Sequence, residues 1–179
     1  MSGEGPRGQR CFFALWPDSK LRRGLATALR ALPGGRPNRP DTLHLTLEFL
    51  GELSPAEMEA ARQAAAAVNA QAFSWTLDRL GYWRHNRILW AGGTTPPELD
   101  HLVMALRREL GTVGIAGPNA DRRFFPHMTL ARKFPPPTAL PVLRPLSWIC
   151  GDFVLARSSL LPGGPSYDLI GRWPLRTPD

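Results

Sequence analysis

The stretch Leu43-His44-Leu45-Thr46-Leu47 decides how the rest of this chain is organised, because it recurs as Pro126-His127-Met128-Thr129-Leu130. Each copy reads His, apolar, Thr, apolar. Side chains alternate between the two faces of a β-strand, so the histidine and the threonine of each copy share one face and the apolar residues lie on the other. We therefore predict two strands, each with an apolar back, that each present an imidazole beside a hydroxyl.

Strands and helices are expected to alternate outward from the first copy. The predicted order is a strand at 11–16, a helix at about 19–32, the first His strand at 43–51, a helix at 55–69, a strand at 73–82 that returns at 88–91, a helix at 97–110, the second His strand at 126–132, and closing strands at 148–155 and 167–175. A Pro-, Gly- and Arg-rich loop, 34–41, leads into the first His strand.

This order predicts an α+β protein of two pseudo-twofold-related lobes, because each half of the chain supplies a helix and a His strand. Each lobe is expected to have an antiparallel sheet with flanking helices, and the active-site cleft is expected between the lobes. The Gly-rich polar residues 1–9 are expected to form a disordered terminus. Residues 10–179 are expected to form a single bilobal domain.

The composition fits a folded domain with a polyanionic partner. The chain has 179 residues, 43% of them hydrophobic, so it can bury a core. Its formal net charge is +7, and only Lys20 and Lys133 are lysines, so arginine carries nearly all the positive charge. The planar guanidinium suits phosphate oxygens, which fits RNA. GC-rich coding, which enriches Ala, Arg, Pro and Gly, explains the same composition equally well.

Several function classes find no support in the sequence. Cys11 and Cys150 lie in apolar runs without a CxxC partner, so two buried free thiols are expected and no zinc knuckle. No apolar run reaches the length of a membrane span, and the first residues lack the apolar core of a signal peptide. The carboxylate clusters that magnesium would need are missing. We expect a cytoplasmic protein with no metal and no cofactor.

The two motifs can carry acid–base chemistry if their faces meet across the cleft. Two imidazoles would then flank one point, with a hydroxyl beside each. One neutral imidazole can act as base while the other, protonated, acts as acid, and the hydroxyls can hold an anion between them. This arrangement suits in-line displacement at phosphorus without a metal. A cyclic phosphodiester is the natural substrate, because attack and departure lie on opposite sides of the phosphorus.

These residues resemble the motifs of the 2H phosphoesterases, which are named for two His-x-Thr-x sequences. Among them the chain is most similar to the bacterial RNA 2′,3′-cyclic phosphodiesterases, historically called 2′-5′ RNA ligases. The similarity covers residues 11–15, 39–51, 124–132 and 167–175. The chain departs from the family at Pro37 and Asn38, where an aromatic residue and a valine are common. It also departs at Phe125, where a polar or basic residue is common.

The resemblance implies a bilobal fold and metal-independent opening of a 2′,3′-cyclic phosphate at an RNA end, leaving a 2′-phosphate. It implies that His44 is the proton donor to the leaving 3′-oxygen and that His127 is the proton acceptor that activates water. It also implies that Thr46 and Thr129 bind the phosphate. The implied partner is RNA with a cyclic phosphate end, tRNA fragments among them, and the implied protein is a monomer without a membrane partner.

Four further residues are candidate substrate contacts. Arg132 follows the second motif and could bind phosphate, although strict alternation places it on the opposite face from His127. Arg39 and Arg123 flank the motifs in loops, where they either bind RNA or are only solvated. Phe125 could stack on a nucleobase or belong to the core.

Alternation also places Glu48 on the His44 face and Phe49 in the core.

Three other functions stay open at this point. The same groups could join a cyclic phosphate to a 5′-hydroxyl, or act on small cyclic-phosphate nucleotides. In a non-enzymatic RNA-binding module the His-Thr pairs would be structural, and salt-sensitive RNA binding would survive His→Ala.

Overall fold

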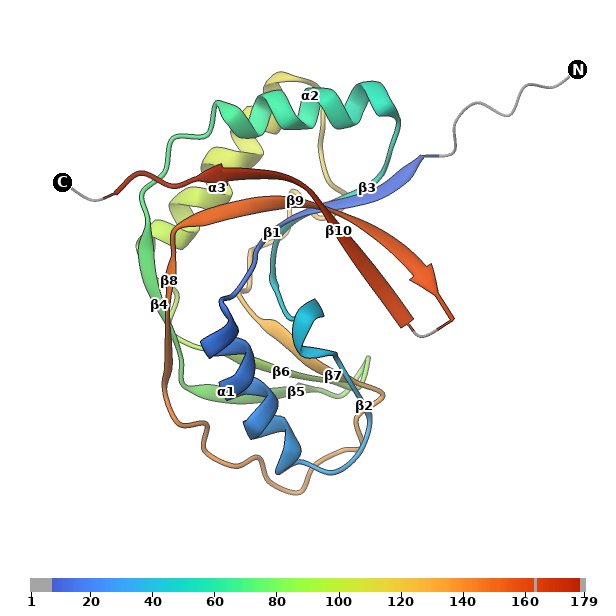
Figure 1. The fold of residues 1–179 in the computed structure, drawn as a ribbon, viewed down its shortest axis with the longest axis vertical. Coiled ribbons are helices and arrows are strands. Elements are labelled where there is room, and N and C mark those ends of the chain that lie inside the picture. Colours follow the sequence, from blue (N-terminus) through green and yellow to red (C-terminus); the bar gives the residue numbers. More distant parts are fainter. Residues whose placement is uncertain (1–7, 163, 178–179) are drawn as a thin grey trace, which may run out of the picture.

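The structure is a computed structural model that describes residues 8–162 and 164–177 (Figure 1). The strands are β1 (Gln9–Leu15), β2 (Arg36–Pro37), β3 (Leu45–Leu53), β4 (Phe73–Leu77), β5 (Arg79–Trp83), β6 (Ile88–Gly92), β7 (Met128–Arg132), β8 (Leu146–Cys150), β9 (Asp152–Leu161) and β10 (Gly164–Pro174). The helices are α1 (Ser19–Arg30), the short 3₁₀ helix η1 (Pro40–Thr42), α2 (Pro55–Ala66) and α3 (Pro97–Thr112).

The main sheet has the strand order β10-β9-β1-β3-β7-β6-β5, and β2 pairs with the edge of β7. Strands β4 and β8 form a separate two-stranded sheet. Neighbouring strands run antiparallel, and β3 meets β7 through a single residue pair, Leu45 with Met128. The main sheet therefore divides into two halves at this junction. The predicted α+β class with antiparallel sheets is confirmed.

The helices are shared unevenly between the two halves. Helices α2 and α3 pack together over the half that contains β3 and β10. Helix α1 contacts η1 and β8 and lies in front of the other half in Figure 1. Helix α1 follows β1 in the sequence but packs with strands from later in the chain. The predicted flanking helices are therefore present in both halves of the sheet, and α1 lies with the half to which β1 does not belong.

Local sequence signals set the helix starts. Ser54 accepts a hydrogen bond from the Glu57 N–H at 3.3 Å, and the Glu57 carboxylate accepts one from the Ser54 N–H at 2.7 Å, so α2 begins with a capping box. Asp18 caps α1 by accepting from the Leu21 N–H at 2.7 Å.

Several predicted boundaries differ from the structure. The chain leaves one sheet for the other at Asp78, so the single strand predicted at 73–82 is the two strands β4 and β5. The two predicted closing strands are three, because Gly151 separates β8 from β9. Strand β1 begins at Gln9, inside the segment predicted to be disordered, and residues 1–7 of that segment lie outside the described residues. Strand β2 lies in the predicted loop 34–41, and η1 begins in it and ends at Thr42.

A bulge interrupts β3 directly after its His-x-Thr sequence. On β1, the neighbours Ala14 and Phe13 pair with Thr46 and Glu48, so Leu47 is an extra residue on β3. A bulge places two residues of one strand opposite one residue of its partner, which reverses the alternation beyond it.

The second motif carries an equivalent bulge in β7. On β6, the neighbours Trp90 and Leu89 pair with Thr129 and Ala131, so Leu130 is the extra residue. The pseudo-twofold relation of the two motifs thus extends to the irregularity that follows each of them.

The bulges overturn three predictions based on strict alternation. Glu48 lies behind the His44 face and is buried, while Phe49 shares a cleft with His44 instead of joining the core. Arg132 lies on the same side as His127. Phe49 and Arg132 occupy equivalent places in the two motifs, five residues after each histidine, so the site face carries an aromatic ring in one half and a guanidinium in the other.

The buried Glu48 carboxylate pairs with Arg107 of α3, which also donates to the Arg122 carbonyl at 3.1 Å. We expect Arg107→Ala to lower the free energy of unfolding by about 3–5 kcal/mol near pH 7.5, because it leaves a buried carboxylate unpaired. The matched control is Arg108→Ala, which removes an exposed pair with Glu109 and is expected to cost at most about 1 kcal/mol. Urea unfolding measures the free energy of unfolding of both variants. Equal losses in the two would contradict a stabilising buried ion pair between Glu48 and Arg107.

Candidate active site

The two His-x-Thr motifs lie side by side at the junction of the two sheet halves. Leu45 of the first motif pairs with Met128 of the second in antiparallel register. The same register brings each histidine opposite the threonine of the other motif. The four side chains that meet here are His44, Thr46, His127 and Thr129.

These side chains line one cavity of about 170 Å³. The residues around it are Asn38, His44, Thr46, Ile88, His127, Thr129 and Arg132. Within the described part of the chain, the hydroxyls of Thr46 and Thr129 make no hydrogen bond to other protein groups, so both can donate to a bound molecule. The cavity therefore combines two imidazoles, two hydroxyls and one guanidinium around a space for a small anion.

Each imidazole is held by a backbone carbonyl two residues earlier in the chain. His44 Nδ1 lies 2.7 Å from the Thr42 carbonyl oxygen, and His127 Nδ1 lies 2.9 Å from the Phe125 carbonyl oxygen. A carbonyl oxygen only accepts, so each Nδ1 carries the hydrogen and donates it. In the neutral ring Nε2 is then the free acceptor. Both rings are therefore fixed in the tautomer that leaves Nε2 for proton transfer.

The first of these carbonyls is itself fixed by η1. The Thr42 hydroxyl donates to the Arg39 carbonyl at 2.8 Å, and Pro40 begins the short helix. This turn directs the Thr42 carbonyl toward the His44 ring.

Aromatic rings surround both histidines. Trp16 stacks on His44 with ring centroids 5.1 Å apart, and Tyr167 meets the same imidazole edge-on at 5.1 Å. Trp83 meets His127 edge-on at 4.6 Å, and the Phe125 ring lies 6.1 Å away. The rings restrict the rotation of each imidazole and reduce its contact with water.

This environment disfavours the charged form of both histidines. Burial lowers the pKa of His44 to about 4, and the nearby charge of Arg132 contributes in the same direction, although the hydrogen bond to Thr42 partly opposes it. Burial and Arg132 also lower the pKa of His127. Both rings are therefore neutral at pH 7 in the free protein, and an anion between them would raise both pKa values.

The lowered pKa of His44 makes stability depend on pH. Below about pH 6.5 the unfolded chain protonates this histidine while the folded protein does not until about pH 4, so the free energy of unfolding falls across that window. We expect His44→Asn to make the decline between pH 7 and pH 4 shallower. Urea titrations at several pH values measure this, with exposed His101→Asn as the control. Parallel curves of unfolding free energy against pH for the wild type and His44→Asn would contradict this contribution of His44.

Arg132 is the predicted contact that the structure brings into the cavity. It lies at the end of β7, beyond the bulge at Leu130. Asn38, which was not predicted as a site residue, holds this bulge: its backbone N–H donates to the Leu130 carbonyl at 2.8 Å and its side-chain amide donates to the Thr129 carbonyl at 2.8 Å. The partners lie 91 positions apart, so no local signal marks Asn38 in the sequence.

The other predicted contacts lie outside this cavity. Arg39 is exposed and forms an ion pair with Asp41 at 3.3 Å. Arg123 and Phe125 line a separate pocket of about 610 Å³. Phe125 is 52% exposed, which excludes the core alternative for this residue.

A wider cleft of about 960 Å³ adjoins the cavity and shares His44, Thr46 and Arg132 with it. Phe12, Phe49 and Tyr167 give this cleft an aromatic wall. Arg10 and Arg157 add positive charge, and the Arg10 guanidinium lies 4.9 Å from the centre of the Phe49 ring. Sequence reasoning missed Phe12, Tyr167, Arg10 and Arg157 because β1, β9 and β10 reach the site only through sheet pairing. It assigned Phe49 of β3 to the core because it did not include the bulge.

Among residues 8–162 and 164–177, no three His, Cys, Asp or Glu side chains cluster closely enough to hold a metal ion. No helix in this part of the chain is long and apolar enough to cross a membrane.

Paired His-x-Thr strands that face one cavity in an antiparallel α+β fold define a phosphoesterase of the two-histidine, or 2H, class. A family described as "LigT like Phosphoesterase" matches residues 15–90. The RNA 2′,3′-cyclic phosphodiesterase of Escherichia coli K12 is 34% identical over 177 residues, which cover 93% of this chain and 97% of that protein. The Thermus thermophilus protein of the same name is 34% identical over 180 residues, and the match covers 93% of this chain and 90% of that protein.

Solved structures agree with this similarity. The crystal structure of E. coli LigT in apo form matches with a TM-score of 0.85 at 32% identity, and the match covers 96% of this chain and 99% of that one. LigT complexed with 3′-AMP matches with a TM-score of 0.84. The chain belongs to the LigT-like phosphoesterase family of the 2H superfamily.

Proposed function

We propose that this protein hydrolyses the 2′,3′-cyclic phosphate at an RNA 3′ end to a 2′-phosphomonoester, without a metal ion. The observation that carries the proposal is the cavity that the two motifs share. In it both imidazoles keep Nε2 as a free acceptor, and neither threonine hydroxyl is hydrogen-bonded to another group in the described part of the protein. The enzymes that match this chain along most of its length are named for this reaction.

The proposed mechanism is in-line displacement. His127 Nε2 accepts a proton from water, and the water oxygen forms a bond to phosphorus as the bond to the 3′-oxygen breaks. His44 donates a proton from Nε2 to that oxygen, which leaves as the 3′-hydroxyl. Thr46 and Thr129 donate hydrogen bonds to the non-bridging oxygens, where preorganised donors stabilise developing charge. The assignment of His44 as acid and His127 as base comes from the family resemblance.

Substrate binding favours uptake from solvent of the proton that the acid needs. Both histidines are neutral in the free protein at pH 7, because burial and Arg132 lower their pKa values. The negative charge of the phosphodiester favours the protonated form of a neighbouring imidazole. We therefore propose that the site takes up one proton when the cyclic phosphate binds, which leaves one histidine charged and one neutral.

The test uses pure protein, EDTA and a short RNA with a 2′,3′-cyclic terminus. We expect the ring to open and only the 2′-phosphomonoester to accumulate. Retention of the intact ring, or a requirement for added divalent metal, would contradict the proposal.

The same assay separates the enzyme from a non-enzymatic RNA-binding module, which would bind the RNA and leave the ring closed.

Short RNAs, tRNA fragments among them, are the proposed substrates, since the arginines of the wider cleft suit a phosphate backbone. We propose further that the chain acts as a monomer in the cytoplasm.

A further inference from the structure

Asn38 joins the second motif to the loop that leads into the first motif. Its backbone N–H donates to the Leu130 carbonyl at 2.8 Å, and its side-chain amide donates to the Thr129 carbonyl at 2.8 Å. Successive carbonyl groups of a regular strand point to opposite sides. The bulge at Leu130 is where one residue can reach two of them. The asparagine therefore binds the bulge itself, as well as the edge of β7.

The bulge decides on which side of β7 the Arg132 side chain lies. Thr129 precedes the extra residue, so alternation from His127 already places it on the site face. Arg132 follows the extra residue, and without the bulge it would point away from the cavity. It lies opposite Arg36 of β2, which runs beside β7 (Figure 1). Like charges directly opposite each other on neighbouring strands are destabilising, so the bulge holds Arg132 in a place that the local charge does not favour.

The segment that begins with Asn38 also contacts the first motif. At its far end, the Thr42 carbonyl accepts the hydrogen bond from His44 Nδ1 at 2.7 Å. Strands β3 and β7 pair directly through a single residue pair. Residues 38–42 thus form a second connection between the two motifs, and Asn38 is its contact with the bulge.

The side-chain bond of Asn38 can be removed without removing the backbone bond. The family to which this chain belongs commonly has valine at this place. Valine keeps the backbone N–H, and with it the donor to Leu130, but its side chain has no donor for the Thr129 carbonyl. Asn38→Val therefore isolates the contribution of the amide.

We propose that Asn38 is a positioning residue, which fixes the bulge in β7 and so keeps Arg132 at the phosphate cavity. Arg132 lines this cavity with both histidines. The inference rests on the proposed function where it concerns the reaction rate, and on the geometry of the bulge where it concerns the place of Arg132. Asn38 acts through Arg132, so removal of the amide has little further effect once Arg132 is replaced.

A double-mutant cycle on kcat/KM for ring opening tests this dependence. We expect Asn38→Val to lower kcat/KM by about tenfold, because small displacements of site groups are costly. In the Arg132→Met background, the same change should lower it by less than about twofold, as expected for two residues that act as a unit. Losses that multiply in the double variant would overturn the proposal.

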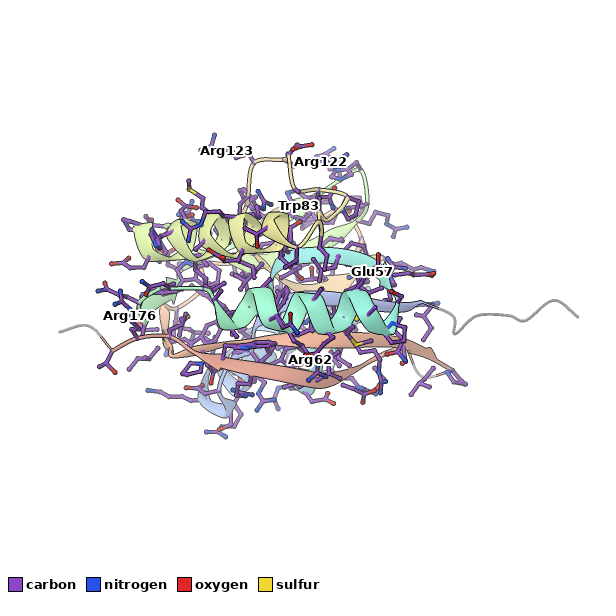
Figure 2. The ribbon with its side chains drawn as sticks, turned by 90° about the horizontal axis from the view of Figure 1, so that it is seen from above. Glu57, Arg62, Trp83, Arg122, Arg123 and Arg176 are labelled. Carbon is purple, nitrogen blue, oxygen red and sulfur yellow. The ribbon has the colours of Figure 1, made fainter. Side chains whose placement is uncertain are left out.

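The matched control is Asn69→Val. Asn69 is exposed and lines a separate pocket together with Arg176. Figure 2 shows Arg176 well apart from Trp83, the ring that meets His127 edge-on. This variant should keep the wild-type kcat/KM.

Titration of His127 by NMR in the free protein separates failure of this proposal from failure of the proposed function. Burial lowers the pKa of His127, and the charge of Arg132 lowers it further. Trp83 and Phe125, which pack around this imidazole, carry no charge. We expect Asn38→Val and Arg132→Met each to raise the pKa of His127, and the double variant to raise it no further than Arg132→Met does.

This shift does not depend on catalysis, so it supports the positioning role even if the cyclic phosphate is never opened. An unchanged pKa of His127 in folded Asn38→Val would overturn the role and leave the hydrolase intact. Asn38→Ser is the second variant in case the valine variant does not fold. Its shorter side chain also loses the bond to the Thr129 carbonyl, and the same rise in the pKa of His127 is expected.

Discussion

Replacing His44 or His127 with alanine is expected to lower kcat for ring opening by roughly 10³-fold. General acid–base catalysis contributes about 10² to 10⁴ per group, and each ring here is held so that its Nε2 faces the cavity. The double variant should be hardly slower than either single variant, because in the proposed mechanism acid and base act in one step and their losses do not add. Single-turnover kinetics on RNA with a cyclic phosphate end measures all three rates.

Two controls make this result specific. His101→Ala removes an exposed imidazole from α3 and should leave kcat unchanged. A diester substrate with an easily expelled leaving group, such as a nitrophenolate, needs no acid. It should therefore restore most of the rate to His44→Ala and none to His127→Ala. Equal rescue of both variants would contradict the assigned roles, and equal loss in His101→Ala would point to misfolding.

The placement of the four motif side chains could be predicted from the sequence, because it depends only on the two-residue period of a strand. Leu45, Leu47, Met128 and Leu130 are all buried, and the His and Thr side chains between them face the cavity. That the two faces meet was a further inference from the doubling of the motif. The contact of Leu45 with Met128 supplies the geometric reason.

The surroundings of the motifs could not be predicted, because they depend on partner strands. The bulges at Leu47 and Leu130 exist only relative to β1 and β6, so alternation along the chain gave the wrong face for Glu48, Phe49 and Arg132. A long-range backbone contact likewise decides the role of Asn38.

The packing of α1 shows the same limit at the level of the fold. Its cap at Asp18 and its apolar stripe are local signals, and the helix forms where they predict it. Which lobe it covers depends on where η1 and β8 lie. η1 begins in a predicted loop, and β8 was predicted only as part of one strand with β9, so neither neighbour indicated the lobe. Local propensity therefore predicted the elements of this protein better than it predicted their partners.

Replacing Arg132 with methionine is expected to lower kcat/KM by roughly 10²-fold or more. Arg132 lines the cavity together with both histidines, and a positive charge there would stabilise the charge that develops on the phosphoryl oxygens. The matched control is Arg39→Met, which removes an exposed arginine that pairs with Asp41 outside the cavity. That variant should keep kcat/KM within about twofold of the wild type, as surface ion pairs contribute little.

Arg132→Met should also move the pH dependence of kcat/KM in a defined direction. The charge of Arg132 lowers the pKa of both histidines in the free protein, so its removal raises both. The proposed mechanism requires one imidazole protonated and the other neutral, so the pH window between their two titrations should shift to higher pH. Arg132→Lys keeps the charge but loses the planar fork, so it should lose rate without this shift. A methionine variant with the wild-type pH profile would show that Arg132 contacts the substrate without acting on the histidines.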